Sequence, residues 1–338
     1  MPLSISSSEV ARQDVAAVGF DPQIRRAVMA AISLVLLVVV GAEFVSRYVF
    51  PRFSQIEARI ESDERETMSI RAPRVGPEPV VLLAGNSLLL RGLDYPRIRR
   101  EMAPEAKVVR MAIENTEYLD WYYGLHHMLA AGVRPSMVVL CLNLGQTVSS
   151  QSLGDYSARH LLGVSELLPL ARDARMDATR ISGLLLAHWS AFYASRATIR
   201  NFVLNVTDPP YADAMHTLAN NAQAPLPADD VLIQTARVRL QSLQRLCDQY
   251  GVQLVLLIPP ALGRYNDLEA SAAQLQHIDF EYPIPVGTIG PEFFADGTHL
   301  NARGAALFTN AIEHFLHIRV QQAESKETAV RFDHQSDV

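Results

Sequence analysis

Four short apolar runs mark the chain, and none of them has the spacing of an amphipathic helix. Runs of this length, bounded by Pro, Gly or Asn, are typical of strands buried on both faces of a parallel sheet. Segments with helical spacing separate them, and strands alternating with helices predict a doubly wound, three-layer α/β/α domain with a parallel sheet. The predicted strands are Val80–Gly85, Ala106–Ile113, Ser136–Asn143 and Val252–Ile258, and the predicted helices are Tyr118–Ala131, Asp230–Tyr250 and Ala302–Arg319.

The longest apolar run lies near the amino terminus. It extends from Ala27 to Ala42, is broken by Glu43 and resumes as far as Phe50. With its second part it is long enough to cross a bilayer, and its aromatic residues fall at the exit side. We therefore expect a transmembrane anchor at 27–50 after a polar tail at 1–26. A cleaved signal peptide is the alternative, because Val40-Gly41-Ala42 would serve as a cleavage site. Arginines flank both ends of the run, so charge does not set its orientation.

Shifts in amino-acid composition predict the boundaries of the segments in the rest of the chain. Residues 51–76 are charged and then rich in Pro and Gly, which predicts a juxtamembrane helix and a linker. The α/β domain is expected over 77–320. Within it, residues 146–229 form a helical insertion that a minimal fold of this class does not need. The insertion is interpreted either as a cap whose proline-rich loop borders the active site or as a cover for the scaffold. Further expectations are helical patterns at 165–175 and 178–204, an irregular segment at 276–292 and a disordered tail at 321–338.

Charge and cysteine content narrow the classes of function. The 338 residues carry a net charge of −6 and no basic block, which argues against nucleic acid as a partner. The arginines between Arg91 and Arg100 are interpreted as a solvated helix face. Cys141 and Cys247 have no metal-ligand spacing and are expected to be buried thiols.

The first candidate for chemistry is Ser87, which follows the first predicted strand. Gly85 and Asn86 end that strand, and the residues after Ser87 fit the start of a helix. A serine at such a turn lies at the carboxyl edge of the sheet, where ligands bind in open α/β folds. The helix amino terminus behind it leaves N–H groups that favour developing negative charge. The same pattern also fits an ordinary turn in which Ser87 caps the helix.

A second candidate lies near the other end of the chain, in Asp296-Gly297-Thr298-His299. Because Asp296 and His299 are three residues apart in a turn, the carboxylate can bond one imidazole nitrogen and leave the other free to act as a base. Alone, the segment would be only a turn before a helix capped by Asn301. Together with Ser87, it predicts a Ser-His-Asp triad.

On these residues the chain resembles the SGNH (GDSL-like) hydrolase superfamily. Gly85-Asn86-Ser87-Leu88 is similar to the nucleophile block, with Asn86 in place of the usual Asp, and Asp296-Gly297-Thr298-His299 is similar to the final block. The resemblance covers roughly 77–320 and is weaker in its middle blocks. It implies an SGNH, flavodoxin-like fold and an oxyanion hole. The implied donors are Ser87, Asn115 in place of the second-block Gly, and Asn143, near which the third block's Gly and Asn occur in reversed order.

The resemblance also implies a function. It points to a cofactor-independent serine acyl ester hydrolase or O-acyl(acetyl)transferase that works through an acyl-enzyme. Membrane-anchored relatives add or remove O-acetyl groups on envelope polysaccharides. The expected substrate is therefore an acylated carbohydrate or another small ester. The expected location is the inner (cytoplasmic) membrane, single-pass, with the catalytic domain on the periplasmic side and possible contacts to envelope assembly partners.

Two other functions compete with this one. A non-catalytic SGNH-like binding or scaffold protein of an envelope polysaccharide assembly machine would explain the weak middle blocks. A metal site using Asp296 and His299 lacks a third ligand at recognisable spacing. The pairs His126-His127 and His314/His317 are expected to be ordinary helix-face residues. The sequence therefore predicts neither a metal nor a cofactor.

Overall fold

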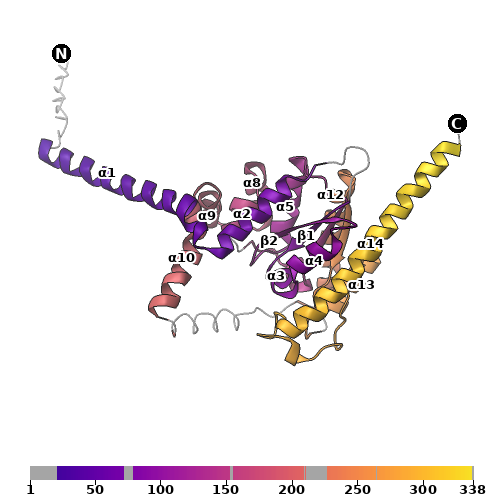
Figure 1. Cartoon of the computed structure of the whole chain (residues 1–338). Helices are drawn as coiled ribbons and strands as arrows, with labels where there is room; N and C mark the ends of the chain where they lie inside the picture. The colour runs from indigo at the N-terminus through magenta and orange to yellow at the C-terminus, as the bar shows by residue number, and fades with distance from the viewer. Residues whose placement is uncertain are drawn as a thin grey trace, which may run out of the picture.

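A five-stranded parallel sheet forms the centre of the computed structural model, which describes residues 21–71, 79–152, 155–208, 210, 227–263 and 265–336 (Figure 1). The strand order is β2-β1-β3-β4-β5, so the predicted doubly wound α/β fold is confirmed. The order reverses between β1 and β3, and open sheets of this kind bind ligands at the carboxyl ends of the strands beside that point. The strands are β1 (Val80–Gly85), β2 (Lys107–Ala112), β3 (Met137–Cys141), β4 (Gln253–Leu257) and β5 (Phe280–Glu281).

Helices cover both faces of the sheet, which explains why the apolar runs do not alternate with polar residues. Along β1, Val81 and Leu83 belong to one hydrophobic core, and Leu82 and Ala84 belong to the other. The first core is completed by α3 (Ser87–Gly92), α4 (Tyr95–Met102) and α14 (Ala302–Ser336). The second is completed mainly by α5 (Tyr118–Ala130), α12 (Asp229–Gln249) and helices of the insertion.

The carboxyl-terminal third departs from the sequence prediction in two places. The segment expected to be irregular contains the edge strand β5, which at two residues is too short to leave a sequence pattern, and it follows α13 (Tyr265–Leu275). The tail expected to be disordered from residue 321 is instead helical, because α14 continues to Ser336. Residues 321–336 contain no Gly or Pro and include several Gln, Glu and Ala residues, which favour a helix.

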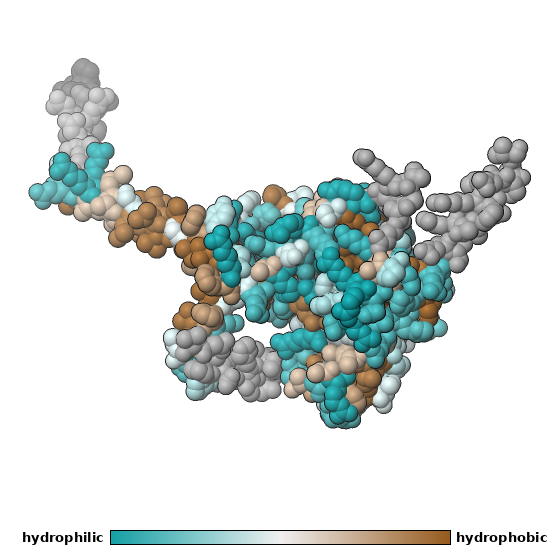
Figure 2. All heavy atoms as spheres, viewed as in Figure 1, coloured by the Kyte–Doolittle hydropathy of each residue, from teal (hydrophilic) through white to brown (hydrophobic). Residues whose placement is uncertain are grey.

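The apolar run near the amino terminus forms one continuous helical segment, Pro22–Arg52, that is long and apolar enough to cross a membrane. Its parts are α1 (Pro22–Phe44), a π-helical turn η1 (Val45–Val49) and a 3-10 turn η2 (Phe50–Arg52). The 23 residues of α1 would be about 35 Å long at about 1.5 Å per residue, compared with about 30 Å for a bilayer core. Figure 2 shows this segment as an apolar arm projecting from the domain.

The helix α2 (Gln55–Met68), which follows the apolar segment, packs on the domain rather than standing apart from it. Ile60 is fully buried in the second core, and Glu57, Asp63 and Thr67 are buried polar residues of the same helix. The helix lies beside the edge strand β2. Because α2 follows the apolar segment after only two residues, the sheet is held close to the end of that segment.

The insertion consists of short helices that reach from the sheet to the apolar segment. Residues 178–204, expected to be one helix, form two helices that break at Ser190, whose extended backbone and side chain cap the second one. Glu43, the residue that interrupts the apolar run, accepts hydrogen bonds from Ser190 Oγ (2.8 Å) and Ala191 N (3.0 Å) at that break. The helices are α6 (Leu144–Val148), α7 (Asp155–His160), α8 (Val164–Asp173), α9 (Ala178–Trp189) and α10 (Ala191–Thr207). Most of the proline-rich loop lies outside the described residues.

Candidate active site

Ser87 lies at a tight turn between β1 and α3, as the sequence predicted. The turn needs glycine at Gly85, because a Cβ there would lie 2.9 Å from the carbonyl oxygen of Cys141 on the neighbouring strand. Asn86 follows as the N-cap of α3 and is fully buried. Its Oδ1 accepts the N–H of Leu88 at 3.0 Å. The chain therefore turns sharply at this point and leaves Ser87 half-buried at the carboxyl edge of the sheet.

The Asn86 side chain also joins the nucleophile turn to the loop after β2. Its Nδ2 donates to the carbonyl oxygen of Thr116 at 2.9 Å. A carboxylate, which only accepts, could not make this bond. The asparagine is thus suited to its surroundings, although the SGNH nucleophile block usually has Asp at this position.

Asp296 and His299 lie in a short loop that an antiparallel bridge between Phe294 and Leu300 closes. Within the loop, Asp296 Oδ1 accepts the backbone N–H groups of Thr298 (3.1 Å) and His299 (2.8 Å). Gly297 has a φ of +78°, a conformation that favours glycine. The loop thus holds the carboxylate beneath the imidazole of the residue three positions later.

The structure brings Ser87, His299 and Asp296 together although 212 positions separate the serine from the histidine. His299 Nε2 is 2.9 Å from Ser87 Oγ, and His299 Nδ1 is 2.9 Å from Asp296 Oδ2. An ionised carboxylate only accepts hydrogen bonds, so Nδ1 carries the proton and Nε2 is left to accept the hydroxyl proton of Ser87. This is the arrangement that activates a serine nucleophile.

Asp296 is held in its ionised form. Partial burial acts to raise its pKa, but hydrogen bonds from the backbone and imidazole of His299 and from the backbone of Thr298 outweigh that effect and lower it. The guanidinium of Arg91 lies 3.5 Å from the carboxylate and adds positive charge on its exposed side. The negative charge that orients and stabilises a protonated His299 therefore persists below neutral pH.

The three proposed oxyanion donors lie at the ends of adjacent strands. Gly85 of β1 pairs with Ala112 of β2 and with Cys141 of β3. Ser87 and Asn143 each follow their paired residue by two positions, and Asn115 follows Ala112 by three. All three therefore fall at the same edge of the sheet. Among the described residues, the backbone N–H groups of Ser87 and Asn115 and the side-chain amide of Asn143 have no hydrogen-bond acceptor.

The backbone at Asn115 explains how an asparagine occupies a position where the superfamily has glycine. Its φ is +58°, in the left-handed region that glycine favours and asparagine tolerates best among other residues. The turn conformation is thereby retained without glycine. Its N–H is left without an acceptor in the described part of the chain.

Asn143 has a structural role that is compatible with donation to an oxyanion. Its Oδ1 accepts the N–H of Gln146 at 2.9 Å, and the Gln146 side chain bonds back to the Asn143 N–H at 3.0 Å, forming a capping box at the start of α6. The cap uses only the oxygen of the side-chain amide. Asn143 can therefore cap α6 with its side-chain oxygen and still offer its side-chain N–H₂ to an oxyanion.

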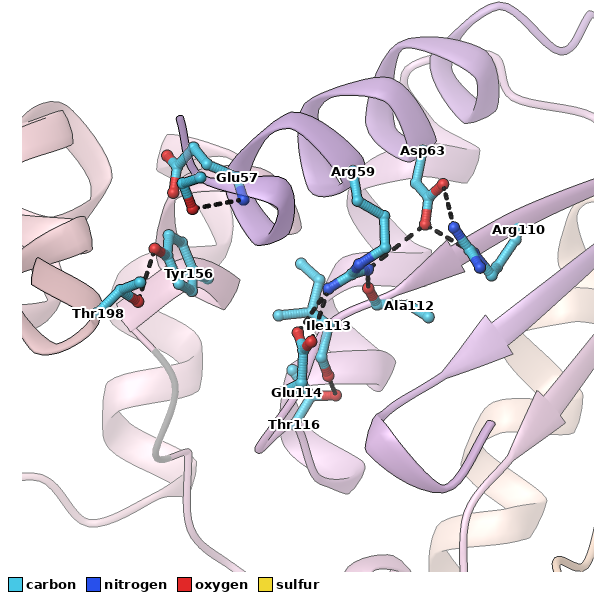
Figure 3. A network of polar contacts seen from close by, with 11 residues as sticks. Glu57, Arg59, Asp63, Arg110, Ala112, Ile113, Glu114, Thr116, Tyr156 and Thr198 are labelled. Atoms are coloured by element: carbon cyan, nitrogen blue, oxygen red, sulfur yellow. Dashed lines mark hydrogen bonds and ion pairs between the residues drawn. The ribbon is translucent and has the colours of Figure 1, made fainter. Parts of the chain in front are cut away.

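Arg59 of α2 supports the loop that carries Asn115, a contact that no sequence pattern indicated (Figure 3). Its guanidinium donates to the carbonyl oxygen of Ala112 at 2.5 Å and to both carboxylate oxygens of Glu114 at 2.8 and 2.7 Å. Asp63, one turn further along α2, pairs with Arg110 of β2 at 2.9 Å. The helix α2 thus fixes the backbone immediately before Asn115.

We expect Arg59→Met to lower kcat on an aryl ester about tenfold with KM little changed. The loop would lose its support, while a donor that acts in the transition state contributes mainly to kcat. Arg99→Met is the matched control, since Arg99 pairs with Glu66 of α2 at 3.0 Å but does not contact the loop. If the Arg59→Met protein is folded and its kcat is unchanged, α2 does not contribute to the activity of the site.

A buried carboxyl lies behind α6, the helix that Asn143 caps. Thr147 Oγ1 is 2.5 Å from Glu269 Oε1, and the second oxygen of Glu269 has no partner among the described residues. Burial raises the pKa of Glu269 to about 8. The folded protein therefore keeps this carboxyl neutral at pH 7, whereas the unfolded chain ionises it.

This difference predicts a pH-dependent stability. Because the unfolded state releases the Glu269 proton first, the free energy of unfolding should fall by up to about 1.4 kcal/mol per pH unit between about pH 4.5 and pH 8. Glu269→Gln should remove that contribution. We expect its melting temperature to exceed that of the wild type at pH 7.5 and the gap to shrink at pH 5. An equal gap at both pH values would contradict a neutral Glu269.

The histidines considered as metal ligands and the two cysteines have other contacts in the fold. Among the described residues, no group of three or more His, Cys, Asp or Glu side chains is placed to hold a metal ion. His126 lies 3.0 Å from Glu166 on the second core side, and His317 lies 2.9 Å from Glu105. Both cysteines are buried, and burial raises the pKa of the Cys247 thiol to about 12. Among the described residues, none of these side chains bonds a member of the triad.

Neither a family model nor a curated protein sequence matches the chain. Solved structures that match its fold include a GDSL-like lipase and a protein inferred to be an acylhydrolase. One is a Bacteroides fragilis protein inferred to be an acylhydrolase, with 11% identity, coverage of 79% of this chain and 100% of that chain, and a TM-score of 0.39. Another is a GDSL-like lipase from Bacteroides thetaiotaomicron, with 13% identity, 79% and 97% coverage and a TM-score of 0.38. TesA has 15% identity, 69% and 95% coverage and a TM-score of 0.34. Similarity of this extent does not define an activity, which rests on the geometry of the site.

Proposed function

We propose that the protein is a serine acyl ester hydrolase or O-acyltransferase that acts on an ester-bearing envelope glycan. The observation that carries the proposal is the unbroken chain of contacts from Ser87 Oγ through His299 to Asp296. In such a chain, the hydroxyl proton can move to Nε2 as the oxygen attacks an acyl carbonyl. The N–H groups near the ends of β1, β2 and β3 would hold the resulting oxyanion.

The reaction would proceed in two acyl transfers. Collapse of the first tetrahedral intermediate expels the alcohol, which takes the proton from His299 and leaves an acyl group on Ser87. His299 then removes a proton from water or from a sugar hydroxyl, which attacks the acyl-enzyme. The second collapse returns that proton to Ser87. Water as acceptor gives a hydrolase, and a sugar hydroxyl gives a transferase.

The glycan as substrate is supported by the resemblance to membrane-anchored relatives and by the apolar segment at the amino terminus. The test is to incubate the purified full-length protein with an aryl acetate donor, with and without a deacetylated envelope polysaccharide. Acetate release alone would identify a hydrolase, and acetyl groups on the polysaccharide would identify a transferase. Turnover of neither donor nor polysaccharide would favour the non-catalytic scaffold.

We expect the full chain to remain in membranes after a carbonate wash, with the domain on the periplasmic side. The bonds from Ser190 and Ala191 to Glu43 tie the end of α1 to the insertion, which supports a retained anchor. Alkaline phosphatase fused after Val338 should be active, because it folds only outside the cytoplasm. If instead a reporter that works only in the cytoplasm is active when fused at the same position, the domain faces the cytoplasm and the proposed orientation is wrong. A mature amino terminus at Glu43 would replace the anchor by a signal peptide.

A further inference from the structure

A polar cleft lies where the apolar segment meets the domain, away from the triad. It has a volume of about 660 Å³, which is within the range of small-molecule sites. Its walls come from η1, α2, α7 and α9. Figure 1 shows α2 and α9 beside the end of α1. We call this polar cleft the membrane-exit cleft. The lining residues used below are Arg47, Glu61, Glu64, Arg65, Arg159 and His160.

Two of the three arginines that line the cleft are not paired with a carboxylate among the described residues. Arg65 and Arg159 have no carboxylate partner within 4.0 Å among the described residues, and Arg159 Nε is buried without a hydrogen bond. Arg47, the third guanidinium, is paired with Glu43 at 2.8 Å. A buried donor without an acceptor, such as Arg159 Nε, is costly, and beside it the exposed guanidinium of Arg65 is also unpaired among the described residues, so the arrangement indicates a ligand that accepts hydrogen bonds.

His160 adds a second buried donor. Its side chain is 4% exposed, and its Nδ1 lies 2.6 Å from Glu64 Oε2. Its Nε2 has no hydrogen bond among the described residues, with Glu57 the nearest carboxylate at 3.9 Å. Burial acts to lower its pKa, but the two neighbouring carboxylates, Glu57 and Glu64, outweigh that effect and raise it. His160 therefore offsets the charge of Glu64.

The cleft also offers one acceptor to a ligand. With Glu64 bonded to His160, Glu61 is the remaining carboxylate of the lining, and no described residue bonds it. A ligand that matched the cleft would therefore combine an anion, for Arg65 and Arg159, with a neighbouring hydroxyl or ammonium donor, for Glu61. A phosphodiester head group of a membrane lipid has both features.

The position of the cleft favours a lipid over a soluble anion. Arg47 lies in η1, three residues after the end of α1 at Phe44, and its guanidinium also donates to the carbonyl oxygen of Trp189 at 3.1 Å. The segments that meet at this end of α1 carry exposed aromatic side chains, with Trp189 57%, Phe192 45% and Phe53 80% exposed. Aromatic residues of this kind gather at the level of lipid head groups. Figure 2 shows apolar surface continuing from the arm onto this part of the insertion.

We propose that the membrane-exit cleft binds the phosphate of a phospholipid head group, with Arg65 and Arg159 holding the phosphate and Glu61 accepting from the adjoining hydroxyl or ammonium group. This site is separate from the proposed acyl transfer and rests only on α1 lying in a bilayer. The bound lipid would seat α2 and the insertion on the membrane surface.

The test uses the delipidated full chain in a nonionic detergent and native mass spectrometry. The probes are dioctanoyl phosphatidylglycerol, dioctanoylglycerol, which lacks the phosphate, and inorganic phosphate. We expect one saturable phosphatidylglycerol per chain and no saturable dioctanoylglycerol. Arg65→Gln and Arg159→Gln should each weaken phosphatidylglycerol binding about tenfold, since each removes charge-assisted hydrogen bonds. Arg172→Gln, at an arginine whose side chain is 81% exposed on α8, makes the same charge change and should bind as the wild type.

Three results would overturn the proposal. One is wild-type affinity for phosphatidylglycerol in the Arg65→Gln protein. Because Arg65 is exposed, this substitution is not expected to affect folding. A second is equal binding of dioctanoylglycerol, which would show that the protein binds the acyl chains and not the phosphate. The third is saturable inorganic phosphate binding at lower concentration than the lipid, which would identify a soluble anion as the occupant. Melting temperatures of all variants establish that they are folded.

Discussion

Replacing Ser87 or His299 by Ala is expected to lower kcat on an aryl acetate by about 10⁴-fold or more. Each substitution removes the activated nucleophile, because Ser87 supplies the attacking oxygen and His299 Nε2, 2.9 Å away, removes its proton. Asp296→Ala should have a smaller effect, since Asp296 orients and stabilises the imidazole but does not receive the proton. Steady-state kinetics with the full-length protein measure all three.

The double variant tests whether Ser87 and His299 act as one functional unit or contribute to catalysis independently. If Ser87 and His299 act as one unit, Ser87→Ala/His299→Ala should be little worse than either single variant. Arg97→Ala is a suitable control, because Arg97 pairs with Glu313 at 2.8 Å on the neighbouring helices and does not touch the triad. If the Ser87→Ala protein turns over substrate as fast as the wild type, Ser87 is not the nucleophile.

Replacing Asn143 by Ser is expected to lower kcat by about 10²–10³-fold with KM little changed. The amide would be lost as an oxyanion donor, and such a bond acts mainly in the transition state. Serine is chosen because its hydroxyl can still cap α6, as Asn143 Oδ1 does for the N–H of Gln146. The melting temperature should therefore hardly change.

Asn143→Ala provides the comparison. It should lose the same activity and also about 1 kcal/mol of stability, because alanine cannot cap the helix. If Asn143→Ser retains wild-type kcat while Asn143→Ala melts earlier, Asn143 is only a cap, and the oxyanion would be held by backbone N–H groups alone.

The sheet could be predicted because its strands are buried on both faces. Runs such as Val80–Gly85 and Met137–Cys141 must be apolar throughout, and this leaves a clear signal in the sequence. The two-residue β5 leaves none, since it is an edge strand with half-buried side chains. The break at Ser190 was missed for a related reason. A serine is compatible with a continuous helix, and what favours the break is the distant carboxylate of Glu43.

The triad could be predicted because its parts are local motifs, each with its own turn. The supports of the site could not. Asn86 bonds Thr116 across 30 positions, and Arg59 bonds Glu114 across 55. Neither pair has a characteristic spacing, so only the packing of α2 and β1 against β2 brings them together. The same holds for Arg65 and Arg159, which meet only when α2 and α7 converge on one cleft.

The measurement that bears most directly on the proposed activity is labelling of the full-length protein with a serine-directed fluorophosphonate, followed by mass spectrometry of its peptides. The reagent attaches only to a serine whose proton is removed by a neighbouring base, and the geometry places His299 to do so for Ser87. We predict one adduct, on Ser87, and none in the Ser87→Ala or His299→Ala proteins. A folded wild-type protein that stays unlabelled, or one labelled equally with and without Ser87, would contradict the assignment of Ser87 as an activated nucleophile.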